Sequence, residues 1–569
     1  MTLSGAKILV ECLKREGVEV IFGYPGGVVI PLFDVLYEEK DIKLIHVRHE
    51  QGAAHAADGY ARASGKVGVC LATSGPGATN LVTGIATAYM DSIPMVAITG
   101  QVATSMIGSD AFQEVDITGI TRPITKHNFL VKDVNDLARI VREAFYIAST
   151  GRPGPVLIDV PKDVLTTKTE FIWPEKVELR SYKPFFKVNQ GQIKKAIELL
   201  EKAQRPVIYY GGGVIAGNAG DLLTEFARKH KIPVTSTLLG LGGYPAETSD
   251  PLYLGMLGMH GTVYANYAIY HSDLILAIGA RFDDRVTGKI DEFAPGAKII
   301  HIDIDPSSIS KNVVVHVPIV GDVKDALTEL LKYDFHVHTD AWLKQIEEWK
   351  KANPLTYQQS SQVIKPQYVI ETLSRLTKGK AIISTEVGQH QMWVAQYYGF
   401  TKPRTLLSSG GLGTMGFGFP AGIGAQVARP SMQTIVVAGD GSLQMNIQEM
   451  ATARYYDIPV KVIVLNNTYL GMVRQWQELF YNKRYSAVKL AKVTCDGKEC
   501  YYPDFVKVAE AYGWWASRVV DPADVEKALK DLLSQEGPAL LDVVIEQEEN
   551  VFPMVPAGAN LTQMIGGLA

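Results

Sequence analysis

The sequence predicts an α/β protein of three domains, each built on a doubly wound parallel sheet. Short apolar runs bounded by Gly or Pro alternate with helical stretches almost from end to end, which is typical of strands buried on both faces between helices. This pattern weakens at residues 181–190 and 352–367, which we interpret as linkers. A chain of 569 residues is long enough for three or four domains of ordinary size. We place the domains at residues 1–185, 186–365 and 366–569.

Each predicted domain contains a series of strand-like runs. Those of the first domain are EVIFGYP, KLIHVRH, VGVCLATSG, PMVAITG and PVLIDVP. Those of the second are RPVIYYGGGV, IPVTSTLLG, DLILAIGARF and KIIHIDIDP. Those of the third are KAIISTEVG, QTIVVAGDGS, VKVIVLNN and ALLDVVIE. Ligands of open parallel sheets bind beyond the carboxyl ends of the strands, so the residues that follow these runs are the first candidates for a functional site.

Composition narrows the class of protein. Lys plus Arg is 56 against 60 for Asp plus Glu, and no basic stripe is present, which disfavours nucleic acid and anionic membranes as partners. Neither a signal peptide nor an apolar run of the ~18 residues of a membrane span is present, so we expect a soluble, cytoplasmic protein. Four cysteines are too few for a disulfide framework. Cys495 and Cys500, in TCDGKEC, have no nearby His and make a poor zinc site.

Two oxygen-bearing side chains follow successive apolar runs in the third domain. Asp440 lies in GDGS, and Asn467 ends VKVIVLNN, so one intervening helix can return the chain to the same edge of the sheet. Mg2+ prefers oxygen ligands, takes one or two carboxylates and shares phosphate oxygens. Asp440, the amide oxygen of Asn467 and the backbone carbonyl of Tyr469 would therefore suit a Mg2+ ion bound to a diphosphate.

The glycines of this turn fit the same interpretation. Gly439 and Gly441 would let phosphate approach the backbone, and Ser442 would begin a helix whose N–H groups favour anions. The plainer alternative is that GDGS is only a strand-to-helix turn. For GDG alone that alternative is the better one; the Asn-Asn turn at this spacing favours the metal site.

GDG followed some 25–30 residues later by NN resembles the signature of thiamine-diphosphate enzymes. That family also requires a Glu just after the second strand of the N-terminal domain, and KLIHVRHEQG supplies Glu50 there. By this resemblance, Glu50 hydrogen-bonds the aminopyrimidine ring of the cofactor and favours the tautomer that removes the thiazolium proton, so that the cofactor can stabilise a carbanion. The alternative is that Glu50 merely occupies the first turn of a helix, where acids are favoured.

Further stretches resemble the acetohydroxyacid (acetolactate) synthases, catalytic subunit, from end to end. They are GYPGG (23–27), ATSGPGATN (72–80), GQV (100–102), DAFQE (110–114), TKHN (125–128), RFDDRVTG (281–288), GGLGTMGFGFPAGIGA (410–425), GMVRQWQELFY (471–481) and the C-terminal VFPMVPAG. The resemblance implies a thiamine-diphosphate-binding fold with a central FAD-binding domain. It also implies catalysis at an interface between two chains, with Glu50 from one chain and the Mg2+ ligands from the other.

The resemblance assigns roles around the thiazolium. Gln113 is expected close to the cofactor, and Lys126 is expected to supply positive charge to a 2-oxo acid carboxylate, although Lys126 can equally be an ordinary solvated lysine. The expected substrate contacts are Gly27, Phe112, Arg285, Trp476 and Met472. The expected thiamine-diphosphate contacts are Gly26, Glu50, Gly388, Gln389, His390, Met415, Gly439, Asp440, Gly441, Ser442, Asn467, Gly471 and Met472. Met415 would hold the cofactor in a bent conformation, although an apolar Met is more often a core residue.

The second domain is expected to bind FAD. The expected contacts are Gly211, Gly212, Gly213, Thr237, Leu238, Met259, His260, Gly279, Arg281, Asp283, Arg285, Asp303, Ile304 and Asp322. A GGG stretch alone is a weak signal, and RFDDRVTG is the better discriminator. The flavin would be structural or vestigial, because the expected reaction transfers no net electrons.

The implied reaction decarboxylates pyruvate and joins the hydroxyethyl carbanion to pyruvate or 2-oxobutyrate. The products, 2-acetolactate and 2-aceto-2-hydroxybutyrate, lead to valine, leucine and isoleucine. Trp476 would favour the larger ethyl group by at most ~1–3 kcal/mol, and Arg285 would pair with the carboxylate of the acceptor. Trp476 can instead be a core or interface aromatic. We expect a homodimer at minimum; a tetramer and a small regulatory subunit stay open, as do the feedback inhibitor and the substrate preference.

Some features depart from the family or leave rivals open. Ala103 stands where many members have Pro, and Val28 where a smaller Ala is usual, so herbicide sensitivity stays open. The stretch 490–505, with its cysteine pair, is longer than usual and has no functional explanation. A pyruvate oxidase would turn over the flavin, a glyoxylate carboligase lacks the activating Glu, and a non-catalytic paralogue would have lost the Glu or a metal ligand.

Overall fold

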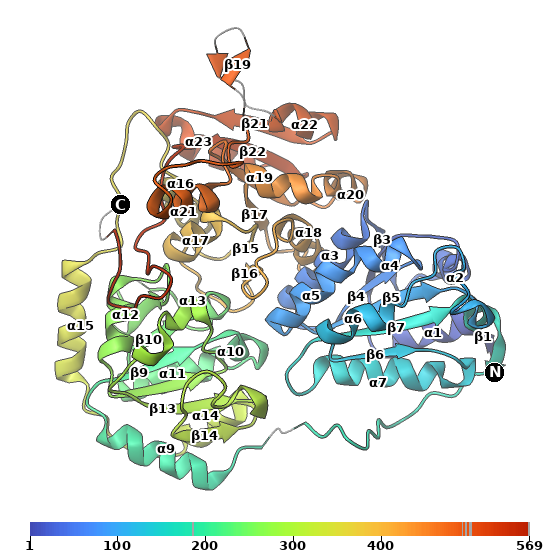
Figure 1. Cartoon of the computed structure of the whole chain (residues 1–569), viewed down its shortest axis with the longest axis horizontal. Helices are drawn as coiled ribbons and strands as arrows, with labels where there is room; N and C mark the ends of the chain where they lie inside the picture. Colours follow the sequence, from blue (N-terminus) through green and yellow to red (C-terminus); the bar gives the residue numbers. More distant parts are fainter. Residues whose placement is uncertain (185–186, 248, 492, 496–497, 500–502, 567–569) are drawn as a thin grey trace.

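The computed structural model confirms three α/β domains with fully parallel six-stranded sheets. It describes residues 1–184, 187–247, 249–491, 493–495, 498–499 and 503–566. The N-terminal, middle and C-terminal domains form three lobes (Figure 1). Helix α3 (Glu50–Ser64) of the first domain faces α18 (Gly418–Ala428) of the third. None of the helices in the described ranges is long and apolar enough to cross a membrane.

The N-terminal domain has the sheet order β3-β2-β4-β5-β7-β6. Its strands are β2 (Val20–Gly23), β3 (Lys43–His46), β4 (Gly68–Ala72), β5 (Met95–Gln101), β6 (His127–Leu130) and β7 (Pro155–Pro161). Its helices are α1 (Gly5–Arg15), α2 (Ile30–Glu38), α3 (Glu50–Ser64), α4 (Pro76–Asn80), α5 (Val82–Asp91), α6 (Ile117–Thr121), α7 (Leu137–Ser149) and α8 (Lys162–Thr166). A small antiparallel pair joins β1 (Thr2–Ser4) to β8 (Lys168–Glu170).

The middle domain has the order β11-β10-β9-β12-β13-β14, which in chain order is 3-2-1-4-5-6, the order of many dinucleotide-binding sheets. Its strands are β9 (Pro206–Tyr210), β10 (Val234–Ser236), β11 (Tyr253–Met256), β12 (Leu274–Ile278), β13 (Lys298–Asp303) and β14 (Val317–Val320). Its helices are α9 (Gln190–Lys202), α10 (Gly212–Ala216), α11 (Gly220–His230), α12 (Val263–His271), α13 (Asp284–Thr287), α14 (Val323–Leu331) and α15 (Asp340–Ala352).

The C-terminal domain has the order β16-β15-β17-β18-β22-β21, so in chain order it repeats the 2-1-3-4-6-5 arrangement of the N-terminal sheet. Its strands are β15 (Ile382–Thr385), β16 (Leu406–Leu407), β17 (Thr434–Gly439), β18 (Lys461–Asn466), β21 (Trp515–Val519) and β22 (Ala539–Val544). Its helices are α16 (Pro366–Thr377), α17 (Gln389–Tyr397), α18 (Gly418–Ala428), α19 (Asp440–Leu443), α20 (Glu449–Tyr455), α21 (Gly471–Phe480), α22 (Phe505–Ala511) and α23 (Val525–Leu533).

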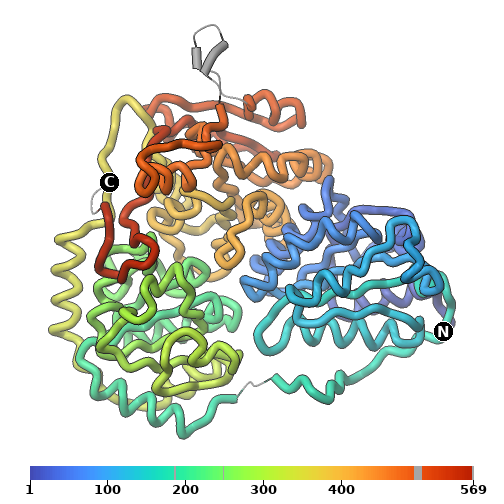
Figure 2. Tube along the Cα trace, viewed as in Figure 1, coloured from blue at the N-terminus to red at the C-terminus, as the bar shows by residue number. Residues whose placement is uncertain are grey.

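Two extended stretches join the lobes, and they agree with the linkers expected from the sequence (Figure 2). β8 ends at Glu170 and α9 begins at Gln190, while α15 ends at Ala352 and α16 begins at Pro366. The domain boundaries at 185/186 and 365/366 stay a prediction. The stretch 490–505 contains a short antiparallel pair, β19 (Val493–Cys495) and β20 (Lys498–Glu499). Cys500 and the side chain of Cys495 lie outside the described residues.

The N- and C-terminal domains meet where α3 crosses α18, and glycine allows the close approach. A Cβ atom on Gly59 would lie 2.0 Å from the carbonyl oxygen of Ala421, and one on Gly424 would lie 1.9 Å from that of Ala56. Real Cβ atoms essentially never come within 3.0 Å of other heavy atoms. The two helix backbones are therefore in direct contact, with Glu50 at the beginning of α3.

Candidate active site

Asp440 and Asn467 lie at the same edge of the C-terminal sheet, as the sequence predicts. They follow β17 and β18, which are parallel neighbours with Gly439 opposite Leu465. Both side chains are buried. Helix α19 begins at Asp440, so the expectation that Ser442 begins the helix is wrong by two residues. Ser442 instead accepts a hydrogen bond from the backbone N–H of Gly439 at 3.2 Å and steadies the turn.

The carboxyl group of Asp440 is in an environment that disfavours its charge. Burial raises the pKa of Asp440 to about 7, against the opposing effect of nearby backbone N–H groups. A cation placed beside this group would reverse the effect, because an opposite charge favours the carboxylate. Among the described residues, Asp440 therefore has no cation that would offset the cost of its buried charge.

The neighbouring donors fit a metal that also binds phosphate. The Asn467 Oδ1 atom accepts a hydrogen bond from the Tyr469 N–H at 3.1 Å, which fixes the amide oxygen at the turn. Thr468 and Leu470 make the backbone bonds to the adjacent segment, and the Tyr469 carbonyl takes no part in them. The described residues contain no group of three or more His, Cys, Asp or Glu side chains that could hold a metal. One carboxylate, one amide and one carbonyl would need phosphate oxygens to complete the octahedron of Mg2+.

The end of β15 supplies the next wall of the site. Gln389 begins α17, accepts a hydrogen bond from the Asn467 Nδ2 atom at 3.4 Å and donates one to Gln475 Oε1 at 2.9 Å. A Cβ atom on Gly471 would lie 2.1 Å from Gln389 Oε1, so Gly471 makes room for this amide. β15 and β17 are adjacent strands from which the chain proceeds to opposite sides of the sheet, and such a switch point is where open α/β sheets bind ligands.

His390 carries an unsatisfied ring nitrogen at this switch point. The residue is buried, and its Nε2 atom has no hydrogen-bond partner. A Cβ atom on Gly439 would lie 2.9 Å from the Nδ1 atom of His390, and one on Gly388 would lie 2.7 Å from its Cε1 atom. Burial lowers the pKa of His390 to about 3, so the ring is neutral at pH 7. Buried polar atoms are normally paired, and an orphaned ring nitrogen beside the Asp440 turn fits a polar ligand such as a diphosphate.

Met415 lies over the same turn. A Cβ atom on Gly441 would be 3.8 Å from the Met415 Cε atom, with the side chains of Leu470 and Leu490 closer still. Met415 is only partly buried, which disfavours the alternative of an ordinary core methionine. Gly441 thus borders an apolar wall made by Met415, Leu470 and Leu490.

Glu386 holds the segment that carries Met415, and the sequence analysis did not single it out. Its fully buried carboxylate accepts hydrogen bonds from the N–H groups of Gly416 at 2.7 Å and Phe419 at 2.9 Å. Burial raises its pKa to about 7. The available signal was the acidic residue at the end of the run AIISTE, which we interpreted only as a strand end.

Helix α21 presents two different faces. Arg474 and Gln475 are buried and bind the C-terminal tail: Arg474 donates to the Glu549 carbonyl at 2.9 Å, and Gln475 exchanges hydrogen bonds with Val551 at 2.8 and 3.1 Å. Met472 and Trp476 are only partly buried, and the Trp476 ring packs against Phe480 with centroids 5.4 Å apart. In a single chain Trp476 is therefore not a core aromatic.

The N-terminal domain holds the second half of the predicted site. Glu50 is the first residue of α3, is 9% exposed, and accepts a hydrogen bond from Asn80 Nδ2 at 3.0 Å. A Cβ atom on Gly77 would lie 3.3 Å from Glu50 Oε1, and one on Gly26 would lie 2.4 Å from the Thr73 Cβ atom. Gly27 has open space around it. The loop that follows β4 thus lies between Glu50 and the GYPGG turn.

This loop also carries orphaned polar atoms. The hydroxyl oxygens of Thr73 and Ser74 are buried and have no hydrogen-bond partner. Gln113 adopts a left-handed backbone with φ 60°, and a Cβ atom on Gly75 would lie 2.8 Å from its carbonyl oxygen. Phe112 is 87% exposed on the single chain. Glu50, Gly26 and Gln113 are therefore brought together, with an exposed aromatic at the rim.

Lys126 is engaged elsewhere. Its ammonium group donates to the Ile147 carbonyl, to the Thr150 carbonyl at 2.7 Å and to the Tyr182 hydroxyl at 3.0 Å. A lysine has three N–H donors, so these acceptors at the end of α7 use all of them. Burial lowers the pKa of Lys126 to about 8. The alternative of an ordinary solvated lysine is wrong, and the expected contact with a substrate carboxylate stays a prediction without support from this geometry.

The residues expected to bind FAD follow all six strands of the middle sheet, at its carboxyl edge. Gly211–Gly213 follow β9, Thr237 and Leu238 follow β10, Met259 and His260 follow β11, and Gly279 and Arg281 follow β12. Asp303 ends β13, Ile304 comes directly after it, and Asp322 follows β14. The switch point between β9 and β12 lies among them. This edge fits a dinucleotide.

The glycines of this edge also have a structural reason. A Cβ atom on Gly213 would lie 2.6 Å from the Gly279 Cα atom, and Gly279 itself has φ 55°. The GGG turn thus packs directly on the turn after β12. Asp283 is the N-cap of α13 and accepts from the Arg285 N–H at 3.1 Å, while the Arg285 side chain is 62% exposed and pairs with Asp284 at 3.6 Å.

Glu50 and the Asp440 turn belong to different domains of the chain. No hydrogen bond or ion pair between described residues links Glu50 to Asp440, Asn467 or Met415. The two half-sites belong to domains that meet through α3 and α18.

Comparison with known proteins identifies relatives along the whole chain. Residues 3–120 match the thiamine pyrophosphate enzyme N-terminal TPP binding domain, 193–330 the central domain and 386–543 the C-terminal TPP binding domain. The acetolactate synthase large subunit of Haemophilus influenzae is 50% identical and the match covers 99% of this chain and 98% of the relative. Isozyme 3 of Escherichia coli is 48% identical with the same coverage. The chloroplastic acetolactate synthase of Arabidopsis thaliana is 50% identical over 99% of this chain and 84% of its own length.

Proposed function

Because the chain belongs to the acetolactate synthase family of thiamine pyrophosphate enzymes, we propose how its residues carry out the reaction of that family. The chain is a thiamine-diphosphate-dependent acetolactate synthase of branched-chain amino-acid biosynthesis. It decarboxylates pyruvate and joins the two-carbon unit to pyruvate or 2-oxobutyrate. When bound, thiamine diphosphate supplies a thiazolium ring that stabilises the negative charge left by decarboxylation on the substrate carbon.

The observation that supports the assignment best is the arrangement at the C-terminal switch point. Asp440 and Asn467 end neighbouring strands beside the orphaned Nε2 atom of His390. We propose that these two residues and the Tyr469 carbonyl hold Mg2+, and that His390 donates to the diphosphate. The raised pKa of Asp440 supports this role, because a buried carboxylate without a partner benefits most from a nearby cation.

We propose that Glu50 completes the site of a second copy of the chain. Its position as the first residue of α3, bonded to Asn80, leaves one carboxyl oxygen for the ring nitrogen of the cofactor. Glu50 holds the proton at that nitrogen, while Met415 sets the cofactor conformation from the other chain. Gln113 and Phe112 border the substrate, and Trp476 favours the larger ethyl group of 2-oxobutyrate.

The middle domain is proposed to bind FAD at its carboxyl edge in a structural role. The 3-2-1-4-5-6 strand order supports a dinucleotide, and the overall reaction consumes no electrons. The relatives' name "large subunit" further supports assembly with itself and with a smaller regulatory partner. We propose a homodimer as the smallest active form.

One assay tests the function. Purified protein with pyruvate, thiamine diphosphate, Mg2+ and FAD should form acetolactate, and no product from folded protein supplied with any needed partner would overturn the assignment. Glu50→Gln should lower kcat by ~100-fold or more, the contribution typical of a proton-transfer group, while thiamine diphosphate still binds. Glu143→Gln is the matched control, because Glu143 is also 9% exposed in the same domain and only pairs with Arg139.

A further inference from the structure

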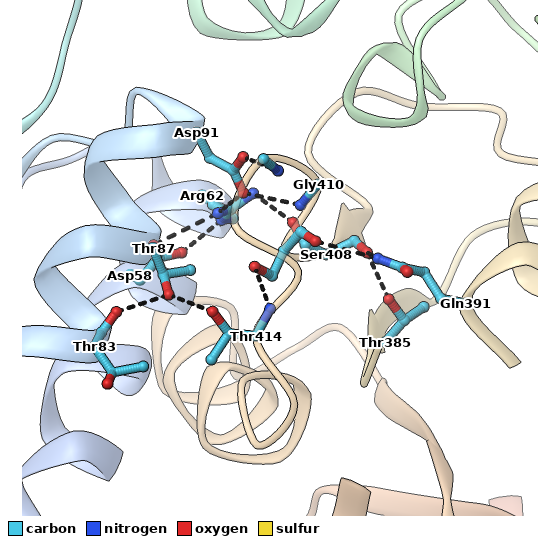
Figure 3. A network of polar contacts seen from close by, with 12 residues as sticks. Asp58, Arg62, Thr83, Thr87, Asp91, Thr385, Gln391, Ser408, Gly410 and Thr414 are labelled. Carbon is cyan, nitrogen blue, oxygen red and sulfur yellow. Dashed lines mark hydrogen bonds and ion pairs between the residues drawn. The ribbon is translucent and has the colours of Figure 1, made fainter. Parts of the chain in front are cut away.

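A buried polar network joins the N-terminal domain to the segment that carries Met415 (Figure 3). At its centre is Arg62, near the end of α3, whose side chain is 7% exposed. The guanidinium pairs with Asp58 at 2.5 Å and with Asp91, the last residue of α5, at 2.7 Å. Its third branch donates to the backbone carbonyl of Ser408, in the C-terminal domain, at 2.9 Å.

Asp91 extends the network to the backbone of residues 408–416, which we call the methionine loop. One carboxylate oxygen accepts from the Gly411 N–H at 2.7 Å, and the other accepts from the Gly410 N–H at 3.1 Å as well as from Arg62. A Cβ atom on Gly411 would lie 2.8 Å from the Asp91 carboxylate. The start of the methionine loop therefore fits directly onto an ion pair of the other domain.

A second contact reaches the residue next to Met415. The hydroxyl groups of Thr87, on α5, and Thr414 are 2.8 Å apart, and Thr87 also bonds the Thr83 carbonyl at 2.9 Å. The Thr414 N–H donates to the Ser409 hydroxyl at 3.0 Å. The methionine loop is thus tied to the N-terminal domain at both its start and at Thr414.

The other side of the loop is tied to the switch point of its own domain. The Ser408 hydroxyl bonds Thr385 at 2.7 Å and Gln391 at 2.7 Å. Gln391 is the neighbour of His390, and Thr385 is the last residue of β15. Ser408 therefore binds Arg62 with its backbone carbonyl and, with its hydroxyl, the segment next to His390, the proposed diphosphate contact.

These observations indicate that the network positions the methionine loop rather than merely holding the two domains together. The apolar and glycine contacts between α3 and α18 already hold the two domains together, as the Gly59 and Gly424 distances show. A buried ion pair adds little net stability compared with an apolar contact, but it demands one geometry. The bidentate, planar guanidinium is the group best suited to fix two acceptors and a carbonyl at once.

We propose that Arg62, together with Asp91 and Thr87, positions the methionine loop and thereby sets the affinity of the protein for thiamine diphosphate. This inference rests on the proposed function of Met415 and His390. Arg62 touches neither cofactor nor substrate, so it acts through the loop. Among the described residues the side chains of Arg62, Asp91 and Thr87 contact only the N- and C-terminal domains. We therefore expect their replacement to affect the binding of thiamine diphosphate and not that of FAD.

The test measures the dissociation constants of thiamine diphosphate, at fixed Mg2+, and of FAD for the full-length protein. Arg62→Lys keeps the positive charge but lacks the planar guanidinium group that binds several acceptors at once, and Thr87→Val replaces only the hydroxyl group. Each should weaken thiamine diphosphate binding, by about tenfold or more for Arg62→Lys, the size expected when a group supporting a site is lost. FAD affinity should stay within about twofold of wild type.

Arg429→Gln is the matched control. Arg429 also crosses from the C-terminal domain to the end of α3, where it donates to the Ala63 carbonyl at 3.0 Å, but it does not contact the methionine loop. It should leave thiamine diphosphate affinity unchanged. An equal loss of thiamine diphosphate affinity in Arg429→Gln and Arg62→Lys would show that both variants only loosen the contact between the domains, and it would overturn the proposal.

The second variant keeps the test decisive if Arg62→Lys does not fold. Thr87→Val alone should then raise the dissociation constant of thiamine diphosphate without changing that of FAD, and an unchanged value would overturn the proposal. Wild type that binds no thiamine diphosphate and forms no acetolactate contradicts the proposed function instead. If the wild-type protein is active and both variants bind thiamine diphosphate as tightly as it does, only the role of the network is contradicted.

Discussion

Replacing Gly59 by Ala should destabilise the junction between the N- and C-terminal domains. The added Cβ atom would lie 2.0 Å from the Ala421 carbonyl oxygen and 2.6 Å from the Ala421 carbonyl carbon. These are backbone atoms of α18, which cannot rotate away as a side chain can. The helices must therefore separate, which loosens the contacts on both sides of the crossing.

The expected size follows from two opposing effects. Overpacking of a tight core costs ~1–3 kcal/mol, and the backbone nature of the neighbour puts this site at the upper end. Ala is a better helix former than Gly by about 1 kcal/mol, which offsets part of the loss. The net loss is then about 2 kcal/mol, and a domain of ~200 residues loses about 2–4 °C of Tm per kcal/mol. We expect the Tm of the transition that includes this junction to fall by ~4–8 °C.

Differential scanning calorimetry of the full chain checks this, because it separates transitions of a protein with several domains. Gly537→Ala is the control, since a Cβ atom there meets nothing within 4 Å. It should shift no transition by more than about 1 °C. A Gly59→Ala protein with unchanged or raised Tm would refute the reasoning, because the helix-propensity gain would then outweigh a clash that the structure shows with backbone atoms.

Three further predictions concern the site. Burial raises the pKa of Glu386 from 4.5 to about 7, so the folded state binds the proton more tightly and the stability of the protein falls as pH rises from about 4.5 to about 7. Glu386→Gln should flatten the curve of Tm against pH in this range, and an unaltered slope would contradict the raised pKa of Glu386. Asp440→Asn should raise the Mg2+ concentration needed for thiamine diphosphate binding at least ~10-fold, measured by titration calorimetry, and an unchanged requirement would remove Asp440 from the metal site. Trp476→Leu should lower the preference for 2-oxobutyrate over pyruvate by up to ~10-fold in the ratio of products, whereas a constant ratio would favour a purely structural tryptophan.

The strands and their edges could be predicted from the sequence because both are local. Runs such as VKVIVLNN combine mostly apolar residues with a polar turn, and the structure places Asp440 and Asn467 at neighbouring strand ends accordingly. The strands that the sequence analysis missed, among them β6, β11 and β21, are half-polar or short. They lack the apolar run that defines a buried central strand.

The network around Arg62 could not be predicted, because its members are far apart in the chain. Arg62 and Ser408 are 346 positions apart, and nothing in the local sequence ARASG distinguishes this arginine from a solvated one at a helix end. The expected contact of Lys126 with a substrate carboxylate stays a prediction, and it shows a second limit of sequence reasoning. The sequence neighbourhood of Lys126 matches the family, but only the tertiary structure shows that its three donors bind the end of α7 and Tyr182.

Glycine signals show most clearly where sequence reasoning reaches its limit. Gly211–Gly213 predict that the backbone closely approaches a neighbouring group. From the sequence we interpreted that group as a flavin. The structure shows that Gly213 also makes room for the turn at Gly279. A glycine in the sequence indicates that another group lies close to the backbone. It does not show whether that group is a ligand or another turn of the chain. The strand order of the middle sheet favours a ligand, because it places the turn at a switch point between β9 and β12. FAD binding at this edge therefore stays a proposal that the topology supports, and the fold requires the glycines whether or not they also border the flavin.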